Sequence, residues 1–448
     1  MTDSPNDKKF MREKIVKPKE TKGKTAGKVF CLILCAVILG AVAAVSFVVS
    51  VPFAKRYLET ETAAPTIPIT IEKDDEPTVT AAVMETMETM GSTAPTETLP
   101  EPETKPAIGD EDDVRDIVKD ELSLLEWTPE KLRAFNQVLT TIGIEANNSI
   151  VTVSSVKQQV DWFDNPVEST GQYAGVILAV NPAEIVILTR EYALKEADVL
   201  RVAFYEGGTA EGTVKQKDTA AGMAVISVNP ADLSKETLDR LKVMELGNSY
   251  SVKNGDLMIA VGSPAGHVHS VKHGMVSYVA KGVQNTDGQT RVFYTDIACN
   301  EEKGIFFLNL SGQLIGWATT NFRTEENSCG TMIMPISEYK GALQKLSNGK
   351  EIPYFGIMGL EVSAGMQNEG IPKGIYITES IAEGPAYLAG IQNGDILTKI
   401  QGQEILTIRD FQNRIESLEN DVEILVTVER KGIDAYKEIE YRVTMGAR

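Results

Sequence analysis

Short apolar segments separated by turn residues fill the sequence from Asn148 to about Gly316, and they limit the fold more than any other feature of the chain. Runs of about 4–8 residues rich in Val, Ile, Tyr and Phe, bounded by Gly, Asn and Pro, are typical of β-strands. Several such strands in succession predict a β-sandwich or a β-barrel. The segments include SIVTVSS, YAGVILAV, EIVILT, LRVAFYEG, MAVISV, DLMIAVG, GMVSYVA and RVFYTDIA.

A helical segment precedes these strands, over residues 113–148. Thr128-Pro129-Glu130 combines a side chain that can cap a helix, a proline for the first turn and an acid near the positive end of the helix dipole. Apolar residues from Leu132 to Leu139 then recur at helical spacing. We therefore expect a helix that begins at Pro129.

A run of 26 residues without a charge, Val29–Ala54, lies near the N-terminus. About 20 apolar residues in a helix cross the hydrocarbon core of a bilayer. Nine Lys and Arg against four Asp and Glu occupy residues 1–28, and such basic flanks stay in the cytoplasm. The run predicts a transmembrane helix at residues 29–54 with the lipid bilayer as its partner, a cytoplasmic tail at 1–28, and extracytoplasmic domains. A cleaved signal sequence is the alternative, although its apolar core spans only about 7–15 residues.

Residues 55–112 have the composition of a linker. Between residues 60 and 106 the sequence contains twelve Thr and seven Pro, with Glu and Asp between them. A segment of this composition buries too little apolar surface to offset its conformational entropy. We therefore predict a disordered tether that holds the folded domains away from the membrane.

The charge of the chain and its few histidines indicate whether it is suited to bind nucleic acids or metal ions. The formal net charge is -19, whereas nucleic-acid binding requires clustered Lys and Arg, so we expect no nucleic-acid partner. The three histidines, His267, His269 and His273, lie in one stretch, GHVHSVKHG. A His-x-His pair can bind a metal ion, but a structural site normally needs four ligands, and a polar surface loop explains the stretch as well. We expect no metal site and no cofactor, with a metal-dependent sensor as an alternative.

Four sequence blocks occur in a fixed order within residues 149–350: LGNSYSVKNGDLMIAVGSPAG (Leu246–Gly266), GMVS, YTDIACN and LNLSGQLIG. They resemble corresponding blocks in the trypsin-like domain of the HtrA/DegP family of serine proteases. The resemblance implies a double β-barrel of two six-stranded halves. It does not by itself imply activity, because these blocks supply turns and inward-facing apolar side chains.

The three catalytic positions of the family carry other residues here. Serine hydrolysis needs a hydroxyl nucleophile, an imidazole base and a carboxylate that orients the base. The resemblance places the histidine at Tyr192 in ILTREYAL and the aspartate at Gly222 in AGMAVIS. The serine falls on Lys303 or Gly304, in a loop that is one residue shorter, NEEKGIFF. None of these side chains can perform the missing role, so we expect a degenerate site.

Residues 351–448 contain the segments YFGI, GIYIT and GPAYLAGIQNGDILTKIQGQEI, followed by a helical pattern from Ile408 to Leu418. They resemble a PDZ domain of the kind that follows HtrA-type protease domains, with mixed α/β structure. Such domains hold the C-terminus of a peptide with the N–H groups of one loop while the peptide extends a sheet. The resemblance implies a peptide site formed by Tyr354, Phe355, Gly356, Ile357, Leu360, Phe411 and Ile415. Phe411 and Ile415 could instead belong only to the core.

Two cysteines lie in the globular part, Cys299 just before the former nucleophile loop and Cys329 just before the segment TMIMPI. Related chymotrypsin-like proteases often bridge these two regions, so the resemblance implies a disulfide between them. Two separate buried thiols are the alternative.

Two functions from different classes follow from this sequence. The first is a membrane-anchored, extracytoplasmic pseudoprotease that binds protein C-termini or extended apolar peptides and acts as a scaffold or regulator in envelope protein quality control. The second is an active HtrA/DegP-type endopeptidase with an unrecognised site. Homo-oligomers occur in the family and are a further expectation.

Overall fold

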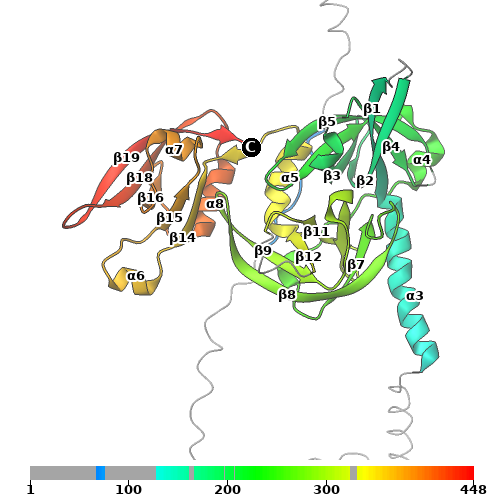
Figure 1. The fold of residues 1–448 in the computed structure, drawn as a ribbon, viewed down its shortest axis with the longest axis horizontal. Helices are drawn as coiled ribbons and strands as arrows, with labels where there is room; N and C mark the ends of the chain where they lie inside the picture. The colour runs from blue at the N-terminus through cyan, green and yellow to red at the C-terminus, as the bar shows by residue number, and fades with distance from the viewer. Residues whose placement is uncertain (1–66, 76–127, 161–165, 196, 206, 323–329) are drawn as a thin grey trace, which may run out of the picture. The chain divides into compact units, whose positions relative to one another are not determined.

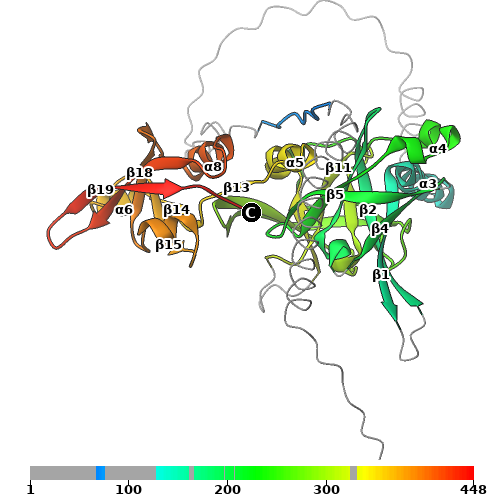
Figure 2. The same ribbon diagram turned by 90° about the horizontal axis from the view of Figure 1, so that it is seen from above.

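The computed structural model describes residues 67–75, 128–160, 166–195, 197–205, 207–322 and 330–448. Among these residues, no helix is long and apolar enough to cross a membrane. The predicted tail and transmembrane helix at residues 1–54, most of the predicted linker, and Cys329 lie outside the described residues. Figures 1 and 2 show the arrangement of the described elements in two views.

The strands between residues 150 and 335 form two closed barrels of six strands each, as the resemblance to the trypsin-like domain implies. The first barrel has the order β1-β2-β3-β6-β5-β4 and the second the order β10-β11-β12-β9-β8-β7, all through antiparallel neighbours. The first barrel consists of β1 (Ile150–Val160), β2 (Pro166–Val180), β3 (Ile185–Arg190), β4 (Val199–Phe204), β5 (Thr209–Asp218) and β6 (Met223–Val228). The second consists of β7 (Leu257–Gly262), β8 (Lys272–Asn285), β9 (Gly288–Thr295), β10 (Ile305–Leu308), β11 (Leu314–Thr319) and β12 (Thr331–Pro335).

In the described part of the chain, three helices accompany the barrels: α3 (Pro129–Ala146), α4 (Lys235–Arg240) and α5 (Lys340–Ser347). Helix α3 begins where the sequence predicts, because the Thr128 side chain accepts a hydrogen bond from the Lys131 N–H at 3.3 Å. That bond satisfies one of the N–H groups that the first turn leaves without a helical partner. Leu139 packs into the core, whereas Leu132, Phe135 and Val138 remain exposed.

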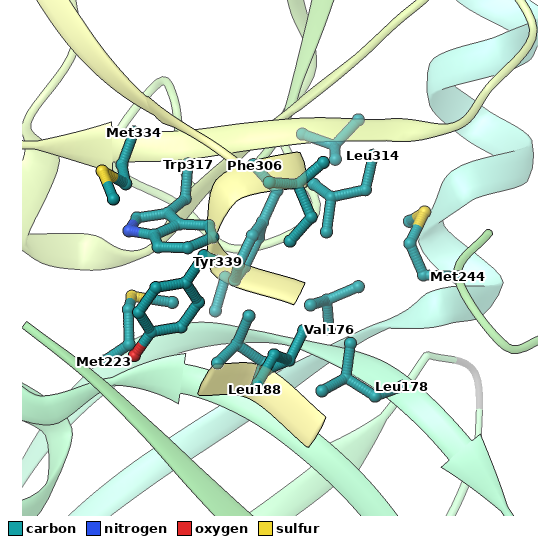
Figure 3. Close-up of a cluster of buried hydrophobic side chains, with 14 of the residues drawn as sticks. Val176, Leu178, Leu188, Met223, Met244, Phe306, Leu314, Trp317, Met334 and Tyr339 are labelled. Atoms are coloured by element: carbon teal, nitrogen blue, oxygen red, sulfur yellow. The ribbon is translucent and has the colours of Figure 1, made fainter. Parts of the chain in front are cut away.

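The largest apolar cluster lies between the two barrels (Figure 3). The first barrel contributes Val176, Leu188 and Met223, and the second contributes Phe306 and Trp317. The ring of Tyr339, which precedes α5, meets the Trp317 ring edge-on with centroids 5.0 Å apart. Because residues of both barrels bury the same apolar surface, the barrels are held to each other, and the loops between them are fixed in place.

The C-terminal region has its own apolar core and its own antiparallel sheet, in the order β14-β15-β16-β18-β19. Its elements are β13 (Pro353–Tyr354), β14 (Ile357–Glu361), α6 (Ala364–Asn368), β15 (Ile375–Ser380), α7 (Pro385–Ala389), β16 (Ile396–Ile400), β17 (Gln403–Glu404), α8 (Ile408–Ser417), β18 (Glu423–Lys431), β19 (Tyr436–Thr444) and β20 (Gly446–Ala447). Helix α8 begins with a reciprocal cap, in which Thr407 accepts from the Asp410 N–H and Asp410 accepts from the Thr407 N–H.

The prediction of a disordered linker is wrong for residues 67–75. The N–H of Ile69 donates to the Asn348 side chain at 2.9 Å, and the N–H of Ile71 donates to the Gln344 side chain at 3.0 Å. Both isoleucines pack against the cluster between the barrels. In IPITI every second residue is Ile, which gives this short extended segment an apolar face that the average composition of the linker conceals.

Candidate functional site

The position predicted for a catalytic histidine lies on a 3₁₀ turn, Glu191–Leu194, directly after β3. This turn presents Tyr192 with 43% of its surface exposed. The Tyr192 ring centroid lies 6.0 Å from that of Tyr173, and the Lys195 ammonium lies 4.8 Å from the Tyr192 ring. Tyr192 therefore takes part in aromatic and cation–π contacts at the protein surface.

The position predicted for the catalytic aspartate is Gly222, and the Arg190 side chain fills the space beside it. Gly222 has a φ of +63°, and a Cβ atom added to it would lie 3.2 Å from Nη2 of Arg190. The buried guanidinium donates a hydrogen bond to the Ala318 carbonyl at 3.3 Å. Burial lowers the pKa of Arg190, and the nearby carboxylates of Glu191 and two residues of the neighbouring loop, Glu301 and Glu302, oppose this shift. A cation thus lies where the hydrolytic mechanism requires a carboxylate.

The former nucleophile loop forms a 3₁₀ turn, Glu301–Lys303, that Asn300 caps by accepting the Glu302 N–H at 3.1 Å. Lys303 extends over the Tyr173 ring, with its ammonium 4.9 Å from the ring centroid. The Tyr173 ring therefore contacts both Tyr192 and Lys303. The pKa of Tyr173 is raised, mainly by burial and in addition by Tyr192 and Glu302.

The structure distinguishes the two candidate serine positions in this loop. Gly304 has a φ of +83°, and a Cβ atom there would lie 2.5 Å from the Ala174 carbonyl oxygen of β2. Real side chains do not tolerate such an approach to backbone, so no residue with a side chain fits at Gly304 without a local rearrangement. Lys303 is therefore the position at which a nucleophile would have to stand.

The three predicted positions come together as neighbours, but their side chains form no catalytic set. The Glu191 N–H donates to the Gly222 carbonyl at 3.0 Å, which joins the histidine and aspartate positions, and Tyr173 links Tyr192 to Lys303. Among nearby described hydroxyls, that of Thr189 donates to the Ala174 carbonyl at 3.0 Å, and Ser263 is fully buried. Neither hydroxyl is available to an external substrate.

His269 lies in a separate environment. Its ring packs on Tyr205 with centroids 4.8 Å apart, and Nε2 lies 3.4 Å from the Thr152 hydroxyl. Burial lowers the pKa of His269, and its Nδ1 has no hydrogen-bond partner among the described residues, so no carboxylate orients the ring. Within the described residues, no group of three or more His, Cys, Asp or Glu could hold a metal ion. The histidine stretch thus gives no support to the metal-sensor alternative.

Cys299 is partly buried, and its Sγ lies 3.2 Å from the hydroxyl of Thr331. Thr331 is two residues after Cys329, whose position is outside the described residues. The predicted pairing of Cys299 with Cys329 therefore stays a prediction.

The loop predicted to bind a peptide carboxylate contacts the side-chain carboxylate of Asp287 in this structure. The N–H groups of Phe355, Gly356 and Ile357 all point to the side chain of Asp287, at distances of 2.8, 2.8 and 3.0 Å from its oxygens. Gly356 has a φ of +87°, which aims successive N–H groups at one point. Sequence reasoning missed Asp287, since its only local signal is the turn sequence TDG.

The remaining predicted peptide-site residues differ in exposure. Leu360 is 43% exposed on β14, whereas Phe411 and Ile415 of α8 are fully buried in the core of the C-terminal domain. Phe411 meets Phe355 edge-on with ring centroids 5.7 Å apart. Phe411 therefore packs against Phe355 of the carboxylate loop from the core of the domain. The burial of Phe411 and Ile415 agrees with the interpretation of both as core residues.

Comparison with known proteins finds a family match within each of the two domains. Residues 174–316 match the trypsin-like peptidase domain family and residues 376–430 match the PDZ domain family. The chain is 27% identical over 326 residues to the serine protease Do-like HtrA of Bacillus subtilis, covering 68% of this chain and 69% of that protein. It is 25% identical over 294 residues to the periplasmic pH-dependent serine endoprotease DegQ of Escherichia coli, covering 64% of this chain and 62% of that protein.

Solved structures support the same fold. The HtrA-type protease AlgW with decapeptide has a TM-score of 0.51 at 19% identity, and the alignment covers 69% of this chain and 98% of that one. The HtrA-type protease AlgW with tripeptide has a TM-score of 0.50 at 21% identity, covering 69% and 97%. The chain thus carries a trypsin-like peptidase domain followed by a PDZ domain, and it is related to the HtrA/DegP-type serine proteases.

Proposed function

We propose that this protein is a non-catalytic relative of the HtrA-type proteases that binds peptides through its PDZ domain. The observation that carries the proposal is which residues occupy the three positions where the family has its catalytic residues. Tyr192 takes the place of the base and Lys303 that of the nucleophile, while the Arg190 guanidinium occupies the space beside Gly222. Acyl transfer cannot begin at this site without a hydroxyl that a neighbouring base can deprotonate.

The PDZ domain supplies the proposed binding of peptides. Its loop from Tyr354 to Ile357 presents three converging N–H groups, which is the arrangement that captures a chain-terminal carboxylate. Strand β14, which continues from this loop, pairs along one edge with β15 and can extend the sheet along its other edge. A related HtrA-type protease has been solved with a decapeptide. The ligands we propose are protein C-termini with apolar last residues, and the role is that of a scaffold or regulator in protein quality control at the cell envelope.

We expect no hydrolytic activity from the purified protein. Fluorophosphonate probes should not label it, and it should not degrade unfolded casein, whereas the Bacillus subtilis relative assayed in parallel serves as the positive control. The reason is that both the nucleophile and its base are missing, and the remaining binding groups alone give only a small residual catalysis. Casein degradation that is lost on substitution of Lys303 or Glu301 would contradict the proposal and favour an unrecognised protease.

We further propose that the two domains lie outside the cytoplasm, anchored by the apolar run Val29–Ala54. Support comes from the length of that run and from its basic flank. Protease treatment of intact cells should therefore remove the PDZ domain, detected with an antibody against residues 351–448. A cytoplasmic marker protein in the same cells should stay intact. A PDZ domain that survives until the cells are lysed would contradict this topology.

A further inference from the structure

The tip of the β8–β9 hairpin is the part of the peptidase domain that reaches the PDZ carboxylate loop. Asn285 pairs with Gly288, so Thr286 and Asp287 form a two-residue connection between the strands. Asp287 has a φ of +62°, a conformation that Asp and Asn adopt more easily than most residues. This backbone turn places the Asp287 side chain at the outermost point of the hairpin.

Asp287 makes four hydrogen bonds to the same short stretch of the PDZ domain. Its carboxylate accepts from the N–H groups of Phe355, Gly356 and Ile357, and its own N–H donates to the Ile357 carbonyl at 2.8 Å. A bound peptide C-terminus would use the same groups, since its carboxylate enters the loop and its backbone pairs with the adjoining strand. Asp287 therefore presents the hydrogen-bonding pattern of a ligand from within the chain.

Contacts on both sides of the hairpin tip add to its similarity to a bound peptide. The Gln284 side chain donates to the Gly359 carbonyl of β14 at 3.3 Å, and the Gln412 side chain of α8 donates to the Gln289 carbonyl at 2.9 Å. Gly288 is so close to Gln412 that a Cβ atom there would lie 2.3 Å from the Gln412 amide nitrogen. The hairpin tip thus lies between β14 and α8, along the edge where a peptide would add a strand.

We propose that the β8–β9 hairpin is an intramolecular ligand that closes the PDZ carboxylate loop, so that peptide C-termini bind only after Asp287 has left it. The inference rests on the proposed peptide-binding function, because it assigns a competitor to that site. It also gives the two domains a means of communication: a peptide that displaces Asp287 releases β8 and β9 of the second barrel from the PDZ domain.

The electrostatics of the contact allow it to be reversible. Burial raises the pKa of Asp287, because the docked carboxylate has lost water, whereas the three N–H donors and the positive charge of Arg448 act in the opposite direction. The loss of hydration opposes docking, and the directed hydrogen bonds favour it. The net free energy of docking Asp287 into the loop is therefore smaller than four hydrogen bonds would suggest. A peptide of moderate affinity can shift the equilibrium between the docked and the undocked hairpin.

The expected effect of Asp287 on peptide affinity follows from the fraction of molecules in which Asp287 has left the carboxylate loop. When the binding-competent state is a minor population, the apparent dissociation constant equals the intrinsic one divided by that fraction. Asp287→Asn keeps the shape and the turn conformation but removes the charge. We expect a gain in affinity of at least tenfold, equivalent to about 1.4 kcal/mol, for a C-terminal peptide.

The experiment uses the full-length protein in detergent with Asp287→Asn and the matched variant Asp434→Asn. Asp434 is exposed on the β18–β19 hairpin, so its substitution removes the same charge away from the contact. Affinities are measured with a fluorescein-labelled library of decapeptides that end in apolar residues, as free acids and as C-terminal amides. Hydrogen exchange at the N–H groups of Phe355, Gly356 and Ile357 reports undocking without any ligand.

The inference is supported if Asp287→Asn accelerates exchange at these three N–H groups and strengthens binding of the free acids at least tenfold, while Asp434→Asn matches the wild type. Faster exchange in Asp287→Asn with no binding of any decapeptide would support the docked contact and reject the proposed peptide-binding function. Unchanged exchange and unchanged affinity would overturn the inference, and so would weaker binding by Asp287→Asn, because Asp287 would then belong to the peptide site.

Discussion

Gly304→Ser should lower the free energy of unfolding of the peptidase domain by about 2–5 kcal/mol, whereas Lys303→Ser should leave a folded protein. At Gly304 two costs combine, a left-handed backbone that costs a residue with a Cβ about 1–2 kcal/mol and an overlap in a closely packed site that costs about 1–3 kcal/mol. The overlap arises because the new Cβ would lie 2.5 Å from the Ala174 carbonyl oxygen in β2. At Lys303 the substitution removes only a cation–π contact with Tyr173, worth about 0.5–1 kcal/mol at a solvent-accessible site.

Urea denaturation followed by tryptophan fluorescence measures this difference, and Trp317, one of the three tryptophans of the chain, is buried between the barrels. Lys303→Ser is the matched control, because it introduces the same side chain one residue away. Neither variant should react with a fluorophosphonate, since the residue at the base position remains Tyr192. A stable Gly304→Ser protein would mean that the former nucleophile loop can move away from β2, and a labelled Lys303→Ser protein would mean that a base lies near it.

Arg430→Met should lower the free energy of unfolding of the PDZ domain by about 3–5 kcal/mol, because it leaves a buried carboxylate without its partner. The Asp395 side chain is 1% exposed, and its two oxygens accept hydrogen bonds from the Arg430 guanidinium at 2.6 and 2.8 Å. Arg430 also donates to the Gly390 carbonyl at 3.0 Å. Asp395 further accepts the Gln392 N–H at 2.9 Å, so it braces the turn in AGIQNGD as the sequence suggests.

Arg442→Met provides the comparison within the same sheet. Arg442 pairs with Glu423 at 3.1 Å, but the two side chains are 77% and 57% exposed. Pairs of this kind contribute about 0–1 kcal/mol, so this variant should be close to the wild type. Native-state hydrogen exchange of the β18 amides measures the PDZ domain separately from the barrels. Equal effects of Arg430→Met and Arg442→Met would show that the Asp395 contact adds nothing beyond a surface ion pair.

Local patterns in the sequence predicted the start of helix α3 and the succession of short β-strands. The Thr128 cap and the succession of short apolar segments each depend on a few neighbouring residues, so both can be read from the sequence. The resemblance to HtrA-type proteases then implied two barrels of six strands each, and the structure gives the order of their strands. It also marked Tyr192, Gly222 and the loop at Lys303 as the positions where the catalytic residues of the family are replaced.

Composition misled the prediction where a short segment differs from its surroundings. Residues 67–75 belong to a stretch rich in Thr and Pro, yet Ile69 and Ile71 pack against the core and bond to side chains of Asn348 and Gln344. Ile69 and Asn348 are 279 positions apart, so no window along the sequence contains both partners. An average over the linker could not reveal this docking.

The tertiary structure alone decided which groups meet at the two candidate sites. It placed the Arg190 guanidinium beside Gly222, restricted Gly304 through the carbonyl of Ala174, and brought Asp287 to N–H groups that follow it by 68 to 70 positions. Each of these contacts joins surfaces that are formed only after the strands have paired and the barrels have packed. The sequence determines the local elements because their hydrogen bonds are short in range, whereas the ligand-like position of Asp287 depends on how two separately folded surfaces meet.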